Sequence, residues 1–182
     1  MASRINDAKA TGAASLAIGQ NSVADKQQGT AVGWKSHAGE NAFAGGSESD
    51  AGFSSVAIGI MLKATLDGSV AIGTGVRIDP NKPAGGYKKV DSTFSVAIGD
   101  KAYVGEDSTG SNVIGHLAEV DTSEYAVVLG TSAKVNKIAN GIAIGYKASV
   151  TTGSTDGGVA IGSYSVAKTR AGLAGYDPEK KG

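Results

Sequence analysis

The sequence predicts an all-β fold, a parallel β-solenoid in which each coil takes up about 14 residues. Three observations lead to this prediction: a short motif that recurs at nearly constant spacing, a glycine-rich composition, and prolines that lie outside the repeats. The motif Ala-Ile-Gly occurs six times, and looser versions with the same glycine extend it along almost the whole chain. Repetition at a fixed short period is the signature of a solenoid, in which each coil contacts only its neighbours.

The repeat glycines set the expected coil length. Successive glycines are separated by 14, 12, 14, 14, 26, 16, 15, 15, 17 and 13 residues. A unit this short has room for two short strands and two tight turns, but not for a pair of helices. We therefore expect one coil per repeat, with like positions stacked about 4.8 Å apart. The glycines are Gly19, Gly33, Gly45, Gly59, Gly73, Gly99, Gly115, Gly130, Gly145, Gly162 and Gly175.

The residues on either side of each glycine predict two strands per coil. Branched apolar residues precede the glycine by one and three positions, as Ile98 and Val96 precede Gly99, and indicate a strand that buries those side chains. Small or apolar residues follow it by three and five positions, as Ala102 and Val104 do, and indicate a second strand that faces the same interior. The outward column of this second strand is mixed in polarity, so we expect it to face solvent.

The column two positions before each glycine is apolar along the whole chain, and we expect it to point outward from the first strand. An apolar outer face of this length has to be covered. The simplest cover is another copy of the chain, arranged about a closed symmetry axis. The alanines expected to make this contact are Ala17, Ala31, Ala57, Ala71, Ala97, Ala143 and Ala160.

The composition limits the function. The chain has 28 glycines among its 182 residues, and its 17 basic and 17 acidic side chains leave it formally neutral, which argues against binding to nucleic acid or direct contact with an anionic membrane. It has no cysteine, so neither a disulfide framework nor a thiolate metal site is expected. The three prolines, Pro80, Pro83 and Pro178, all lie outside the predicted strands, where proline would remove a ladder hydrogen bond.

The 26-residue step contains about twelve extra residues, PNKPAGGYKKVD at 80–91, which we interpret as a surface insertion between coils. Its Lys82, Tyr87, Lys88 and Lys89 are the best candidates for a ligand-binding loop. The alternative is a tolerated insertion, or a loop that links neighbouring chains.

No catalytic residue, cofactor or metal ligand is expected. The two histidines, His37 and His116, lie at different offsets from their glycines and are interpreted as surface residues. The sequence GTGVRI at 73–78 begins like a dinucleotide fingerprint but lacks its last glycine. Trp34, the one tryptophan, follows a repeat glycine and could anchor a ligand, although we expect it to fill a gap in an irregular coil.

The SVAIG block at this spacing, followed by the small-x-apolar pair, resembles the YadA-like head repeats of trimeric autotransporter adhesins over about residues 12–175. The resemblance implies a left-handed parallel β-roll assembled as a homotrimer, at the exposed tip of a fibre on the outer membrane of a Gram-negative bacterium. It implies non-enzymatic attachment to a host matrix protein, a host-cell receptor, a glycan or another bacterial surface. Residues 1–11 would then be an N-terminal lead-in, and residues 176–182 a tail toward the next module.

The repeat pattern leaves two other solenoid classes as alternatives. A left-handed β-helix acyltransferase would be an enzyme, but its hexapeptide repeats make longer coils and it uses a histidine between subunits. An ice-binding solenoid would need a flat row of threonines, which neither predicted outer column provides.

Overall fold

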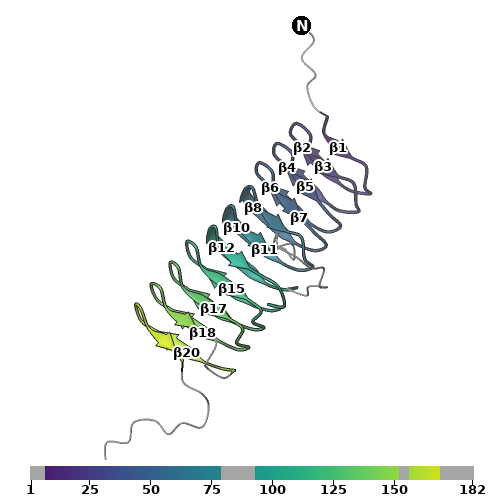
Figure 1. Ribbon diagram of the computed structural model, residues 1–182. Helices are drawn as coiled ribbons and strands as arrows, with labels where there is room; N and C mark the ends of the chain where they lie inside the picture. The colour runs from purple at the N-terminus through teal and green to yellow at the C-terminus, as the bar shows by residue number, and fades with distance from the viewer. Residues whose placement is uncertain (1–6, 79–92, 152–155, 169–182) are drawn as a thin grey trace, which may run out of the picture.

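The computed structural model describes residues 7–78, 93–151 and 156–168, and over these residues the chain is a parallel β-solenoid of two sheets (Figure 1). Each coil contributes one strand to each sheet. The coils stack along a single direction, with β1 and β2 at one end and β20 at the other. Every strand pair in both sheets is parallel, which confirms the predicted fold class and the prediction of one coil per repeat.

The odd-numbered strands of the described residues form one sheet of eleven strands. They are β1 (Lys9–Ala10), β3 (Val23–Ala24), β5 (His37–Ala38), β7 (Asp50–Ala51), β9 (Lys63–Ala64), β11 (Arg77–Ile78), β13 (Tyr103–Val104), β15 (Glu119–Asp121), β17 (Lys134–Asn136), β19 (Ser149–Val150) and β21 (Val166–Ala167). Since β1 pairs with β3, the stack begins before residue 12, where the sequence placed its start.

The even-numbered strands form the second sheet, with ten strands among the described residues. They are β2 (Leu16–Ile18), β4 (Thr30–Val32), β6 (Phe43–Gly45), β8 (Val56–Ile60), β10 (Val70–Thr74), β12 (Val96–Asp100), β14 (Asn112–Ile114), β16 (Val127–Leu129), β18 (Ile142–Ile144) and β20 (Val159–Ile161). Below, each coil is named by its even-numbered strand.

The register places identical positions of the repeat on top of one another. Ala71 of β10 pairs with Ala57 on one side and with Ala97 on the other. In β6 the register corrects the sequence assignment by one residue, because Gly45 pairs with Ile58. The repeat glycine of that coil is therefore Gly46, which has a φ of 119°. The two consecutive glycines at this point made the sequence ambiguous.

Two turns close each coil, and we name them by their place beside the even-numbered sheet. The leading edge consists of the two turn residues that come shortly before each even-numbered strand, such as Thr93 and Phe94 before β12. The trailing edge consists of the two residues that follow the repeat glycine, such as Asp100 and Lys101 after Gly99. The second residue of each pair has a left-handed conformation, with φ 55° at both Phe94 and Lys101.

The repeat glycines are required because backbone from the next coil lies against them. Gly99 has a φ of 140°, and a Cβ atom there would lie 2.5 Å from the carbonyl oxygen of Gly115. Such a φ is costly for any residue with a side chain, and the carbonyl cannot move away without disturbing the next coil. This position thus accounts for the constancy of the motif.

The interior of the coils corrects the sequence-based expectation of which side chains point inward from the even-numbered strands. The alanines predicted to face another chain point inward: Ala31, Ala57, Ala71, Ala97 and Ala143 are 0% exposed and Ala160 is 3% exposed. Ala17, in the first coil of the even-numbered sheet, is partly buried against the same core. None of them is available for contact with another copy. The branched residues before the glycine, expected inside, lie on the outer side.

The physical reason lies in the thickness of the coil. Two sheets joined by such short turns lie close together, so one of two facing columns has to be small. On the odd-numbered strands and directly before them, the inward residues are those that the sequence predicted, among them Ala102, Val104, Ala118 and Val120, all at most 1% exposed. Alternation alone could not separate the two sides of the first strand, since both are apolar and a one-residue shift exchanges them.

Several predictions fall on residues that the structure does not describe. These are Lys82, Tyr87, Lys88 and Lys89 of the insertion at 80–91, the glycine at 175, and the tail at 176–182. Among the described residues, no helix has the length and hydropathy needed to cross a membrane.

Candidate functional surfaces

The outer side of the even-numbered sheet is an almost continuous surface of large apolar side chains, which we call the apolar face. Its members alternate with the buried column of alanines and valines. Ile58 is 42% exposed, Leu129 45% and Ile161 66%. The apolar face consists of Leu16, Ile18, Val32, Phe43, Val56, Ile58, Val70, Ile72, Val96, Ile98, Ile114, Val127, Leu129, Ile142, Ile144, Val159 and Ile161. Sequence reasoning anticipated a surface that needs a cover but assigned it to the neighbouring column.

The outer side of the odd-numbered sheet has a different chemistry. Charged and polar side chains dominate it, and neighbouring strands pair opposite charges: Asp50 lies beside Lys63, and Glu119 beside Lys134. Each such cross-strand pair contributes up to about 1 kcal/mol. The expected solvent-facing column is confirmed, and the two outer faces of the roll thus differ in polarity.

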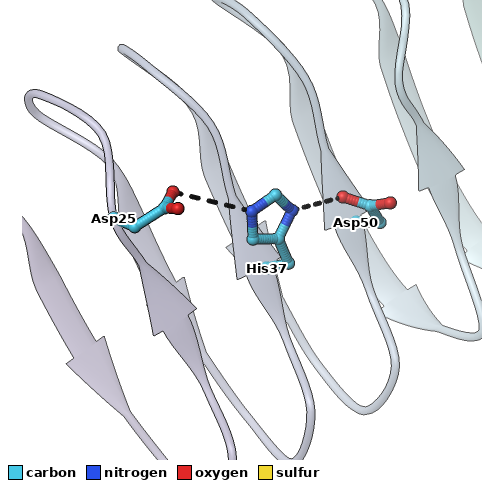
Figure 2. Close-up of polar contacts among 3 residues, drawn as sticks. All are labelled: Asp25, His37 and Asp50. Carbon is cyan, nitrogen blue, oxygen red and sulfur yellow. Dashed lines mark hydrogen bonds and ion pairs between the residues drawn. The ribbon is translucent and has the colours of Figure 1, made fainter. Parts of the chain in front are cut away.

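His37 connects three successive coils on this polar side (Figure 2). Its Nδ1 lies 2.8 Å from Oδ1 of Asp50 in the following odd-numbered strand, and its Nε2 lies 3.8 Å from Oδ1 of Asp25, just after β3. The hydrogen bond with Asp50 raises the pKa of His37, and partial burial opposes the shift. The other histidine, His116, places Nε2 3.2 Å from Oδ2 of Asp100.

The partners of the His37 imidazole define the chemistry of this cluster. Among the described residues, no hydroxyl group is hydrogen-bonded to His37, and no group of three histidine or acidic side chains is placed to hold a metal ion. Its chemistry is that of a charge-assisted hydrogen bond that joins neighbouring coils.

Trp34 lies on the trailing edge and is 42% exposed, so the expectation that it fills a gap in its coil was wrong. Lys35 places its Nζ 4.2 Å from the centre of the indole ring, and the same ammonium lies 3.9 Å from Glu48. The exposed face of the tryptophan is therefore partly occupied by a cation of its own chain.

Tyr146 and Tyr164 form a second aromatic group on the trailing edge, where their rings meet edge to face at 5.2 Å. Nζ of Lys147 lies 5.1 Å from the first ring and 5.6 Å from the second. A hydrogen bond with Lys147 lowers the pKa of Tyr146, and the same contact raises the pKa of the lysine. Nothing in the sequence spacing indicated this pair, because the two tyrosines occupy different positions of their repeats.

The insertion is bracketed by β11, which ends at Ile78, and by Thr93 on the leading edge. Differences in coil length also fall between the odd-numbered strand and the leading edge. The stretch that follows the repeat glycine is constant instead: β13 begins four positions after Gly99, and β21 four positions after Gly162. In repeat proteins, insertions on one side often lie on the binding side.

Comparison with known proteins adds one finding. A family model described as YadA head domain repeat (2 copies) matches residues 10–36, 51–75, 122–148 and 139–165, which together make up more than half of the chain. Each match covers about two coils of the solenoid. No curated protein shows significant similarity to the chain.

Proposed function

The chain belongs to the YadA head domain repeat family, and from this premise we propose that it is the head of a trimeric autotransporter adhesin that assembles as a homotrimer through the apolar face. The head would attach a Gram-negative bacterium to host matrix, host cells or other bacteria without catalysing a reaction, and it would do so from the exposed end of a fibre on the outer membrane.

The apolar face is the main observation that supports the proposed homotrimer. It runs along the whole described stack, whereas soluble monomers rarely expose a continuous apolar surface of this kind. Burial of large aliphatic side chains stabilises by roughly 25 cal/mol per Å² of area removed from water. The polar outer side of the odd-numbered sheet offers no comparable gain. A closed arrangement about one axis covers every apolar face and leaves every polar face in solvent.

Attachment would then occur through the surfaces that the assembly leaves exposed. Three copies present the same surface three times, so contacts that are individually weak can together give firm attachment. The insertion at 80–91, with Lys82, Tyr87, Lys88 and Lys89, is our candidate for part of that surface.

Sedimentation velocity of the intact chain tests the assembly. We expect three times the mass of one chain, and expect the double variant Ile114→Asp, Leu129→Asp to dissociate because it places carboxylates on the apolar face. Lys134→Asp, which changes the polar face, is the matched control and should remain a trimer. A folded monomer for the unmodified chain would contradict the proposal.

A binding screen tests attachment. The trimer is applied to immobilised matrix proteins, arrayed glycans and bacterial cells, and a second form without residues 80–91 is compared with it. Retention on at least one class of surface supports the adhesin role, and loss of retention in the shortened form assigns the site to the insertion. No retention on any of them by a verified trimer would contradict attachment.

A further inference from the structure

Exposed apolar side chains extend beyond the apolar face onto both edges, but only in certain coils. On the leading edge these are Phe53, Phe94 and Tyr125, which are 47%, 71% and 59% exposed. Turns favour small or polar residues, and a bulky side chain is uncommon at the left-handed conformation of Phe94 and Tyr125, with φ of 55° and 53°. The corresponding positions of other coils hold residues such as Asn41 and Asn140, so the turn itself does not require a ring.

The rings of Phe94 and Tyr125 reach back along the stack to the preceding coil. A Cβ atom on Gly68 would lie 2.6 Å from Cδ1 of Phe94, and one on Gly110 would lie 2.8 Å from Cδ1 of Tyr125. The two rings therefore lie at the levels of the β10 and β14 coils, over glycines that leave room for them. Phe53 belongs to the β8 coil.

The trailing edge carries aliphatic side chains in the coils that match these levels. Ile60 and Met61 of the β8 coil are 50% and 55% exposed, and Leu117 of the β14 coil is 47% exposed. In the β10 coil the corresponding residue is Gly75, which has no side chain of its own, and Cγ of Lys101 from the next coil lies 3.6 Å from the place of its missing Cβ. The aromatic residues elsewhere on this edge, Trp34, Tyr146 and Tyr164, are also exposed, but each has a lysine ammonium of its own chain within about 6 Å of its ring centre.

A closed assembly brings these two edges together. Because the apolar face occupies every coil, all of it is covered only when the stacks lie parallel to the symmetry axis, and rotation about that axis keeps each coil at its own level. In such a ring the interface is heterologous, so the leading edge of one copy meets the trailing edge of the next. The leading edge keeps a constant distance to its strand in every described coil, as Phe94 lies two positions before Val96 and Tyr125 two positions before Val127.

We propose that the edges form a level-matched seam between copies, in which Phe53 packs against Ile60 and Met61, the ring of Phe94 lies over Gly75, and that of Tyr125 packs against Leu117. This inference rests on the proposed trimer and adds to it the residues that join the copies beside the apolar face. The seam would fix the axial register of the copies. A repetitive apolar face alone specifies this register weakly, because a shift by one coil again brings equivalent apolar residues together.

Cysteine cross-linking tests the seam without background, because the chain has no cysteine of its own. The matched variant Phe53→Cys, Ile60→Cys has both thiols in the β8 coil, on opposite edges of one copy and about 20 Å apart along an extended strand. A disulfide needs Cα atoms within about 7 Å, so it can form only between copies. Mild oxidation is expected to give covalent trimers on a non-reducing gel.

The mismatched variant Phe53→Cys, Leu117→Cys is the control, because its thiols lie three coils apart, or about 14 Å along the axis. It is expected to remain uncross-linked. Equal cross-linking of both variants, or none in a form that sedimentation shows to be trimeric, would overturn the seam and leave the proposed function standing. Monomers in sedimentation would instead reject the proposed trimer itself.

A second measurement does not depend on disulfide geometry. Leu117→Ser is expected to raise the trimer dissociation constant at least tenfold with the circular dichroism spectrum unchanged. Lys137→Ser, at an exposed bend directly after β17 and outside both edges, should leave the dissociation constant unchanged. Equal dissociation constants for the two variants would also overturn the seam.

Discussion

Nδ1 of His37 lies 2.8 Å from Oδ1 of Asp50, which is the residue one coil further along in the same outward column. The pair therefore joins two coils through side chains, in addition to the backbone ladder. Asp25 lies on the other side of the imidazole, at 3.8 Å from Nε2. The hydrogen bond and charge of Asp50 outweigh the effect of burial, so the pKa of His37 is raised above 6.5.

A raised pKa in the folded state makes the contribution of His37 largest in acid. The contribution is complete below 6.5, the ordinary pKa, and is lost as the pH rises through the higher folded pKa. We expect His37→Gln to lower the thermal midpoint more at about pH 5.5 than at about pH 8.5, by the equivalent of up to about 1 kcal/mol for a half-exposed pair. In an Asp50→Asn background the effect of His37→Gln should change little with pH. Thermal unfolding at one protomer concentration measures the effect of His37→Gln in both backgrounds. A pH-independent effect in the unmodified chain would refute the raised pKa of His37.

The inward direction of the alanine column predicts the effect of a larger side chain there. Ala71 is 0% exposed and is stacked between Ala57 and Ala97, so Ala71→Leu adds three carbon atoms to a filled interior. We expect a loss of roughly 1–3 kcal/mol in unfolding free energy from this overpacking. Ile72→Leu, which conserves volume on the apolar face, is the matched control and should cost less. Denaturant unfolding at fixed protomer concentration measures both losses. A larger loss for Ile72→Leu than for Ala71→Leu would show that the alanine column faces outward.

The sequence predicted the period, the two strands per coil and the interior of the odd-numbered strands, because glycine spacing and alternation are local properties of the chain. It predicted the wrong side for Ala97 and Ile98, because both columns of that strand are apolar and alternation cannot distinguish them. Which column faces inward is decided by the distance between the two sheets. That distance depends on how sharply the chain turns after Gly99. The backbone of the next coil lies close to the repeat glycine only in the folded structure. In the sequence this contact leaves no pattern other than the glycine itself.

The candidate surfaces were predicted less completely than the fold. The edge residues Tyr125 and Leu117 occupy unrelated places in the sequence, and their common place at the level of the β14 coil appears only once the register is known. Similarly, His37 and Asp50 are thirteen residues apart and become neighbours because their strands stack. In a repeat protein, the strand register has to be known before the positions of irregular residues in different coils can be compared.

The repeat glycines give a prediction that separates crowding from backbone strain. Gly99→Ala combines a φ of 140° with a Cβ atom 2.5 Å from the carbonyl oxygen of Gly115, and a loss well above 1 kcal/mol is expected. Gly162, with φ 114°, is the matched control because no described atom lies within 4 Å of its added Cβ. Gly162→Ala therefore adds backbone strain but no close contact with the described residues, and we expect it to cost less than Gly99→Ala. Similar losses for the two variants would show that the next coil yields to the methyl group.

Buried serines supply the last prediction. The hydroxyl of Ser111 donates to the carbonyl oxygen of Ser123 at 2.9 Å and accepts from the amide of Ala126 at 3.0 Å, so it serves two backbone groups of the next coil. Ser111→Ala leaves a buried N–H without that acceptor, and a loss of about 1–3 kcal/mol is expected. Ser36 is also fully buried, but its hydroxyl donates to the carbonyl oxygen of Gly33 within its own coil.

Ser36→Ala is thus the matched control for Ser111→Ala, with the same atom removed at the same burial and no bond between coils lost. We expect it to cost less than the other variant in denaturant unfolding at equal protomer concentration. The difference should also appear in amide hydrogen exchange, where the Ala126 amide loses protection in Ser111→Ala and not in Ser36→Ala. Unchanged protection of Ala126 would mean that the backbone N–H finds another acceptor, and the serine would then have no part in joining the coils.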